Sequence, residues 1–289
     1  MVAVITGGGT GIGLVMARAF ASNGAKRVYL LGRRHDVLTT AAAEFPSIMV
    51  PMPCDVTSKD SLQSAVDKIT LETGYINLLV ANSGVTGPLQ GWNPSLSVSE
   101  VRASMFEQGI MDDMTQAMHV NVTGAFFTIV AFLELLDEGN KRACKQGGFG
   151  APLSTGSADV PSIQSQVIVT SSIAAFSRMP MSAPAYAASK AAILHLTKHA
   201  SSNMARYGIR ANALAPGLFP TELAQVLTGG RDPGTESFED KRFIPARRFG
   251  GDEEMAGTVL YLASRAGAYC NGMVLMCDGG RLGVMLSSY

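Results

Sequence analysis

Two side chains in the segment Ala185-Tyr-Ala-Ala-Ser-Lys-Ala-Ala are spaced for proton transfer. Tyr186 and Lys190 lie four residues apart in a strongly helical composition, so both are expected on one face of a helix. A lysine ammonium beside a phenol favours the phenolate, which predicts that the pKa of Tyr186 falls from about 10 toward the operating range. The pair therefore predicts a general acid–base site. Taken alone, such a pair is usually a coincidence or an ordinary pair on the surface.

A serine hydroxyl is expected at the same place. The β-branched run Gln166 to Ser171 predicts a strand, and Ser172 follows it, 14 residues before Tyr186. Adjacent residues of a strand point to opposite faces, so only one of the two serines faces the site. We favour Ser172, with Ser171 as the alternative. A third interpretation is that both serines only cap backbone groups at the strand end.

A glycine-rich turn at the start of the chain is suited to binding phosphate. The strand Val2 to Thr6 runs into Gly7-Gly8-Gly9-Thr10-Gly11-Ile12-Gly13, and an apolar helical pattern follows. Absent side chains let backbone amides and a helix N-terminus approach a pyrophosphate closely. A purely structural turn is the competing interpretation of a lone glycine motif. The predicted cofactor contacts here are Gly7, Thr10, Gly11, Ile12 and Gly13.

The elements around these motifs alternate between short apolar strands and helix-length segments. Nearly continuous apolar strands joined by crossovers indicate parallel pairing with helices on both faces. The sequence therefore predicts an α/β fold, a single doubly wound Rossmann domain over residues 1–289 with about seven parallel strands. Besides Val2 to Thr6, the expected strands are Arg27 to Leu31, Ile48 to Cys54, Asn77 to Ala81, Gln166 to Ser171, Arg210 to Ala215 and Met273 to Cys277.

Two stretches interrupt this alternation. Residues 139–165 are rich in Gly, Ser and Pro, and we expect an exposed insertion loop there. Residues 217–248 follow the carboxyl end of a strand, where open sheets bind ligands, so we expect a substrate lid.

Two motifs occur in this order along the chain: Thr6-Gly7-x-x-x-Gly11-x-Gly13, then Tyr186-x-x-x-Lys190. This pattern resembles the short-chain dehydrogenase/reductase family over essentially the whole chain, with a leaning toward 3-oxoacyl-(acyl-carrier-protein) reductases and fungal carbonyl reductases. The resemblance implies a nicotinamide cofactor and a catalytic set of Asn121, Ser172, Tyr186 and Lys190. In the family, the asparagine holds a water that links the lysine to solvent. A buried, hydrogen-bonded core asparagine is the simpler interpretation of Asn121.

The sequence after the second strand bears on cofactor choice. It reads Leu31-Gly32-Arg33-Arg34, without the carboxylate that would bind the ribose hydroxyls of NAD. A guanidinium suits a 2′-phosphate, so Arg33 and Arg34 favour NADP(H) over a pair of ordinary surface arginines. The resemblance adds further cofactor contacts, with Ala81 and Ser83 departing from the family's Asn-Asn-Ala-Gly turn. They are Asp55 and Val56 at the adenine, Asn82 and Gly84 after the fourth strand, and Pro216, Gly217 and Thr221 at the nicotinamide.

Together these features predict an NADP(H)-dependent oxidoreductase that reduces a ketone-type carbonyl or oxidises the matching alcohol. An imine reductase of secondary metabolism, or a cofactor-binding cyclase or scaffold without redox activity, remains an alternative. Net charge is zero and the charged fraction is 16%, so neither nucleic acid nor membrane is an expected partner. Four cysteines without metal-ligand spacing fit the cytoplasm, and we expect no metal, even at His195 and His199. The resemblance implies a homodimer or homotetramer.

Overall fold

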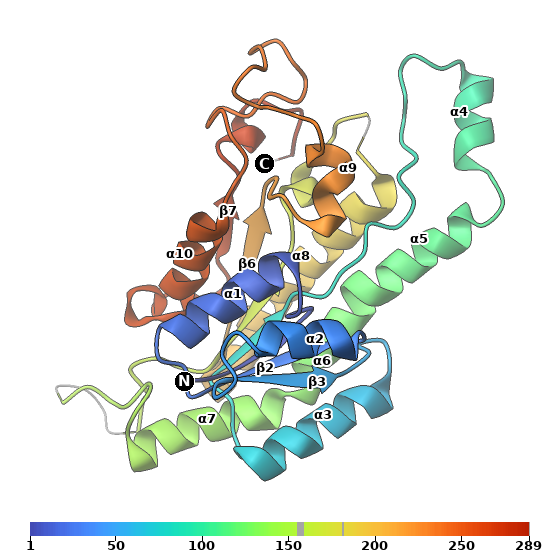
Figure 1. The fold of residues 1–289 in the computed structure, drawn as a ribbon. Helices are drawn as coiled ribbons and strands as arrows, with labels where there is room; N and C mark the ends of the chain where they lie inside the picture. Colours follow the sequence, from blue (N-terminus) through green and yellow to red (C-terminus); the bar gives the residue numbers. More distant parts are fainter. Residues whose placement is uncertain (155–158, 181, 289) are drawn as a thin grey trace.

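The computed structural model describes residues 1–154, 159–180 and 182–288. Its centre is one sheet of seven parallel strands in the order β3-β2-β1-β4-β5-β6-β7 (Figure 1). The chain starts in the middle, builds outward to β3, and then returns to add β4 beside β1. Strand order thus reverses between β1 and β4, the place where such sheets leave a crevice at their carboxyl edge. The strands are β1 (Val2–Thr6), β2 (Arg27–Gly32), β3 (Met49–Pro53), β4 (Leu78–Ala81), β5 (Gln166–Thr170), β6 (Arg210–Pro216) and β7 (Val274–Cys277).

The sheet is buried on both faces, which explains why its strands are nearly continuous apolar runs. In β1, Val2 and Val4 pack into one core cluster, whereas Ala3 and Ile5 pack into the other. The first cluster is covered by α3 (Lys59–Glu72), α6 (Ala125–Ala131), α7 (Leu133–Gln146) and α8 (Pro184–Met204). The second is covered by α1 (Gly11–Ser22), α2 (His35–Ala42) and α10 (Asp252–Ala263). The predicted doubly wound sheet is confirmed, and every strand lies within one residue of its expected ends.

The expected insertion loop over residues 139–165 is wrong in its first part. Helix α7 continues to Gln146 and ends at Gly147, whose φ is +75°. Gly139 is a position of close packing within that helix, because a Cβ there would lie 2.1 Å from the carbonyl oxygen of Ile76. The glycine that suggested a loop instead lets α7 approach the chain just before β4. Residues 147–154 and 159–165 form neither helix nor strand, and 155–158 lie outside the described residues.

Residues 217–248 are irregular except for a 3-10 turn at Glu222–Ala224 and the short helix α9 (Gln225–Thr228). The excursion of the chain between β4 and the next long helix was not predicted. Between β4 and α5 (Ile110–Met118), the chain extends away from the sheet and carries α4 (Val98–Met105), which has no buried residue (Figure 1).

Candidate active site

A cleft of about 580 Å³ opens at the carboxyl ends of the strands. It is lined by the segments that follow β1 to β6, and so lies where the strand order reverses. All of the predicted site residues except Asn121 line it. These are Gly7, Thr10, Gly11, Ile12, Gly13, Arg33, Arg34, Asp55, Val56, Asn82, Gly84, Ser172, Tyr186, Lys190, Pro216, Gly217 and Thr221.

The glycine turn is built for close backbone approach. Gly7 and Gly11 have φ of +66° and +52°, a region that favours glycine, and a Cβ on Gly13 would lie 2.2 Å from the carbonyl oxygen of Gly7. The following helix α1 begins after Thr10 with no side-chain cap and no acidic residue in its first turn. Its first backbone N–H groups therefore remain available to an anion. This arrangement fits the pyrophosphate of a dinucleotide.

Asn82 braces this turn from the neighbouring strand. Its Nδ2 donates to the carbonyl oxygens of Thr6, at 3.1 Å, and Gly7, at 3.4 Å. In return, Thr6 Oγ1 accepts the backbone N–H of Asn82 at 2.9 Å and that of Ser83 at 3.0 Å. These contacts join the ends of β1 and β4, so the residue that was predicted from the family turn holds the two sides of the crevice together.

The far end of the cleft carries charged side chains. Arg33 and Arg34 are exposed and line the cleft, and Arg34 Nη2 lies 3.5 Å from Glu222 Oε2. Asp55 Oδ1 accepts the backbone N–H of Thr57 at 2.9 Å and its hydroxyl at 2.7 Å. These hydrogen bonds, with a smaller contribution from Arg33, hold the pKa of Asp55 below its ordinary value.

At the other end, Lys190 is buried beside the cleft floor. Its Nζ donates to the carbonyl oxygen of Thr170 at 2.9 Å and lies 5.5 Å from the centre of the Tyr186 ring. Gly84 is next to it, since a Cβ there would lie 3.4 Å from Lys190 Nζ. Burial lowers the pKa of Lys190 to about 8. The helical spacing thus brings lysine and tyrosine together as predicted.

The expected fall in the pKa of Tyr186 is wrong for this structure. Burial raises the pKa of Tyr186, and the side-chain hydrogen bond with Ser172 opposes this only in part. Burial acts on Lys190 as well, so desolvation disfavours the charged form of both groups. At neutral pH the phenol is therefore held in its protonated form.

The two serines separate as strand alternation predicts. Ser171 is buried, and its Oγ donates to the carbonyl oxygen of Lys190 at 2.8 Å, which ties β5 to helix α8. Ser172 Oγ accepts the backbone N–H of Ala174 at 3.1 Å and interacts with Tyr186. Ser172 is therefore the serine whose hydroxyl lies at the tyrosine.

Asn121 lies behind the cleft, in a π-helical turn over His119–Gly124. Its Oδ1 accepts the backbone N–H of Val85 at 2.8 Å, while Nδ2 donates to the carbonyl oxygen of Val85 at 2.8 Å and to Ser189 Oγ at 2.9 Å. The side chain is 2% exposed and thus acts as a clamp between the segment after β4 and helix α8. π-Helical turns are frequent at functional sites, but nothing in the spacing of residues 119–124 predicts one.

The lid segment begins over the glycine turn. The backbone N–H of Gly217 donates to the carbonyl oxygen of Cys277 at 2.9 Å, and a Cβ on Gly217 would lie 2.7 Å from the Cα of Asp278. Thr221 Oγ1 accepts the backbone N–H of Ala224 at 3.2 Å and so starts the 3-10 turn. Among the lining residues that sequence reasoning missed, six lie in the expected lid or close to Asn121 in the sequence, and that position was their only available signal. They are Gln116, Val120, Phe219, Glu222, Leu223 and Ala224.

Two absences among the described residues bear on other functions. No group of three or more His, Cys, Asp or Glu side chains is arranged to hold a metal ion among them. No single described helix has the length and apolarity to cross a membrane. The segments Ile110–Ala131 and Leu133–Gln146, which meet at a bend of 43°, reach that length and apolarity only when taken together.

Comparison with known proteins places these features in context. The family profile described as short chain dehydrogenase matches residues 1–143, and the one described as enoyl-(acyl carrier protein) reductase matches residues 155–281. The short-chain dehydrogenase/reductase SAT3 of Stachybotrys chartarum is 60% identical over 274 residues, covering 95% of this chain and 100% of that protein.

Solved structures agree with these sequence matches. A short-chain type dehydrogenase/reductase from Mycobacterium marinum is 30% identical with a TM-score of 0.75, covering 97% of this chain and 94% of that one. A gluconate 5-dehydrogenase from Burkholderia cenocepacia, solved with NADP and tartrate, is 28% identical with a TM-score of 0.72, covering 98% and 95%.

Proposed function

Because the chain belongs to the short-chain dehydrogenase/reductase family and is an oxidoreductase of that family, we propose that it uses NADP(H) to reduce a ketone-type carbonyl or oxidise the matching alcohol. One observation carries this proposal. Tyr186, Ser172 and Lys190 line the same cleft as the glycine turn and Arg33, so proton transfer and dinucleotide binding share one site.

The residues of the cleft fit an NADP-type dinucleotide. The turn from Gly7 to Gly13 would hold the pyrophosphate, and Asp55 would bind at the adenine. Arg33 and Arg34 would bind the 2′-phosphate through planar, charged donors. The NADP found with the gluconate 5-dehydrogenase supports this choice by analogy. When bound, the cofactor supplies or accepts the hydride.

The protein's own groups account for the proton. Tyr186 stays protonated at neutral pH because burial raises its pKa, which suits donation of a proton to the carbonyl oxygen of a substrate. Ser172 would donate a hydrogen bond to the same oxygen and stabilise the charge that develops there. Lys190 would bind the ribose and set the charge beside the phenol. Asn121 would hold the segment after β4 against helix α8, through its hydrogen bonds with Val85 and Ser189.

The test is NADPH oxidation with ketones, quinones, β-ketoacyl thioesters and cyclic imines. Tyr186→Phe should lower kcat at least about 100-fold, as loss of a general acid does, without weakening NADPH binding. Tyr207→Phe is the matched control, because Tyr207 is 58% exposed. Normal turnover by Tyr186→Phe would refute the assignment of roles.

Cofactor choice has its own test. Arg33→Ser should raise the Michaelis constant for NADPH about 10- to 100-fold, the loss of one or two charge-assisted hydrogen bonds, and leave that for NADH nearly unchanged. A wild-type preference for NADH would overturn the interpretation of Arg33.

We also propose a cytoplasmic homodimer or homotetramer. Support comes from α6, where Phe127 and Val130 leave 54% and 43% of their surface exposed, an apolar face that association would cover. All four cysteines are free thiols. Light scattering should give the mass of two or four chains, and Phe127→Glu should shift it toward one; a wild-type monomer would contradict the proposal.

A further inference from the structure

The last residues of the described chain lie against the loop that follows Ser172. The backbone N–H of Arg178 donates to the carbonyl oxygen of Leu286 at 2.9 Å, and that of Ser288 donates to the carbonyl oxygen of Phe176 at 2.8 Å. Ser177 and Ser287 pair between them as an antiparallel bridge. The C-terminal segment, which we define as residues 278–288, is therefore hydrogen-bonded to the loop that directly follows the cleft-lining Ser172.

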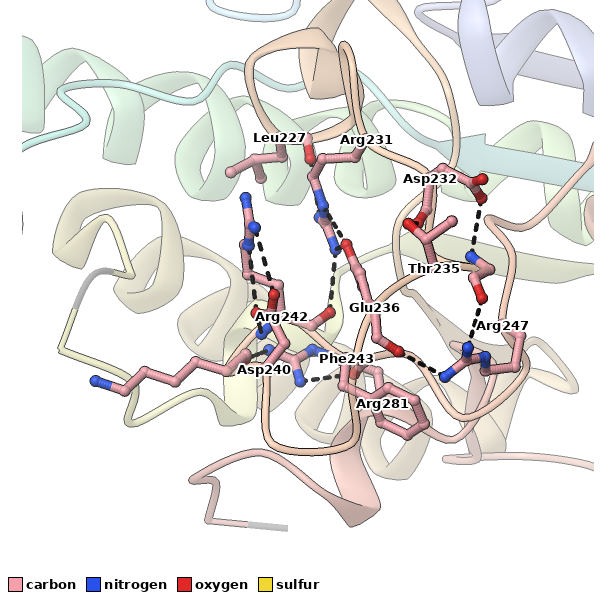
Figure 2. Close-up of polar contacts among 12 residues, drawn as sticks. Leu227, Arg231, Asp232, Thr235, Glu236, Asp240, Arg242, Phe243, Arg247 and Arg281 are labelled. Carbon is pink, nitrogen blue, oxygen red and sulfur yellow. Dashed lines mark hydrogen bonds and ion pairs between the residues drawn. The ribbon is translucent and has the colours of Figure 1, made fainter.

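The same segment also holds the later part of the 217–248 lid, through Arg281. Its Nη1 donates to the carbonyl oxygen of Phe243 at 2.8 Å and its Nη2 donates to that of Lys241, both in the 217–248 lid. The backbone N–H of Ala246 adds a bond to the carbonyl oxygen of Gly279 at 2.9 Å. Figure 2 shows Arg281 pointing at the backbone beside Phe243. One planar guanidinium thus fixes two successive points of an otherwise irregular chain.

Within the lid, a second arginine continues these contacts toward the cleft (Figure 2). Arg231 pairs with Glu236 at 2.7 Å, and their side chains are only 11% and 8% exposed. Its Nη1 donates to the carbonyl oxygen of Leu227 in α9 at 2.9 Å, and its Nη2 donates to that of Arg242 at 3.1 Å. Helix α9 follows directly on Leu223 and Ala224, which line the cleft. Arg231 therefore fixes the cleft-lining part of the lid to the part that Arg281 holds.

From these contacts we propose that Arg281 and Arg231 are positioning residues, and that the C-terminal segment is a strap that sets the distance between the lid and the loop after Ser172. Partly buried guanidinium groups suit this role because each donates to several carbonyl oxygens in a fixed geometry. Neither arginine lines the cleft, so both act on substrate through the elements they hold. The kinetic part of this proposal rests on the proposed reductase function.

The first experiment compares Arg281→Ala with Arg265→Ala, an exposed arginine outside the network, and with Arg281→Lys. Misplacing the cleft-lining part of the lid by about 1 Å costs up to about 100-fold in kcat/KM. We therefore expect Arg281→Ala to raise KM for the ketone about 10- to 100-fold, with kcat changed less and the NADPH dissociation constant within about twofold. Arg281→Lys should recover only part of this, because an ammonium lacks the planar fork. Wild-type KM in Arg281→Ala would overturn the proposal.

The second experiment does not depend on turnover. Deleting residues 286–289 removes the contacts to Phe176 and Arg178 but keeps Arg281. Hydrogen exchange, followed by mass spectrometry, should accelerate over residues 173–180 in the deletion, and over 241–246 in Arg281→Ala, while β1 and β5 keep wild-type protection. Unchanged exchange in both variants refutes the strap even if ketones are reduced. Accelerated exchange with no ketone turnover by the wild type would instead refute the reductase function alone.

Discussion

Lys190 should make the folded protein less stable than the same protein without it. Burial lowers its pKa from an ordinary value of 10.5 to about 8, and at 1.36 kcal/mol per unit this corresponds to about 3 kcal/mol. The folded state holds this proton less tightly than the unfolded chain does. Below about pH 8 the buried ammonium therefore costs stability, and the cost is relieved as the pH rises from about 8 toward 10.5.

Lys190→Met removes this cost while filling a similar volume. The variant also loses the hydrogen bond from Lys190 Nζ to the carbonyl oxygen of Thr170, worth about 1 kcal/mol. We therefore expect Lys190→Met to be more stable than the wild type by about 2 kcal/mol at pH 7. The gain should vanish near pH 10 and reverse above about pH 10.5, where the wild-type lysine is neutral in both states and only the lost hydrogen bond separates the two proteins.

Urea unfolding of both proteins at pH 6.5 to 10.5 measures the difference in their free energies of unfolding. Groups that titrate in both proteins contribute equally to each and drop out of this difference. Lys198→Met is the matched control, since Lys198 lies on the same helix with an exposed side chain. A constant stability difference across this pH range, or a less stable Lys190→Met at pH 7, would refute the argument. A destabilising group that persists in a cleft is typical of a site kept for function.

Two further substitutions test the frame of the site. Gly13→Ala should abolish NADPH binding and lower the free energy of unfolding by about 1–3 kcal/mol, because its Cβ would lie 2.2 Å from the carbonyl oxygen of Gly7. Fluorescence titration measures the binding, and urea unfolding measures the stability. The control Gly257→Ala, in α10 with no atom within 4 Å, should instead stabilise by about 0.5–1 kcal/mol. Asn121→Ala should lower unfolding free energy by about 2–4 kcal/mol, since both polar groups of Val85 lose their buried partner; a loss below about 1 kcal/mol would contradict the clamp.

The sheet could be predicted because its signals are local and repeated. Each strand is an apolar run that must be buried on both faces, and each crossover spans a helix length. Parallel pairing also predicts where the site lies, because the segments that follow successive parallel strands meet at one edge of the sheet. Gly139 shows where this reasoning fails. A glycine marks a loop or a close contact, and only the packing of α7 against Ile76 decides between them.

The long-range contacts of the lid and the C-terminal segment had no local signal. Arg231, Arg247 and Arg281 each donate to backbone carbonyl oxygens, and a carbonyl acceptor leaves no mark on the sequence of its partner. Glu236, which pairs with Arg231, lies in a stretch whose composition reads only as loop. Such contacts become visible only when the fold has brought the segments together.

The tyrosine–lysine pair shows why spacing alone does not determine a pKa. Four residues of helix place Lys190 beside Tyr186, and from that the sequence predicts an acidic phenol. The fold also takes both groups out of water, and desolvation disfavours the charged form of each, so the pKa of Tyr186 rises while that of Lys190 falls. Both shifts move the pair toward a neutral phenol and a neutral amine. A site in this condition can release a proton to an oxygen that becomes negative, and any anion bound near Lys190 would favour keeping its ammonium charged, so the charge state of the lysine depends on what occupies the cleft.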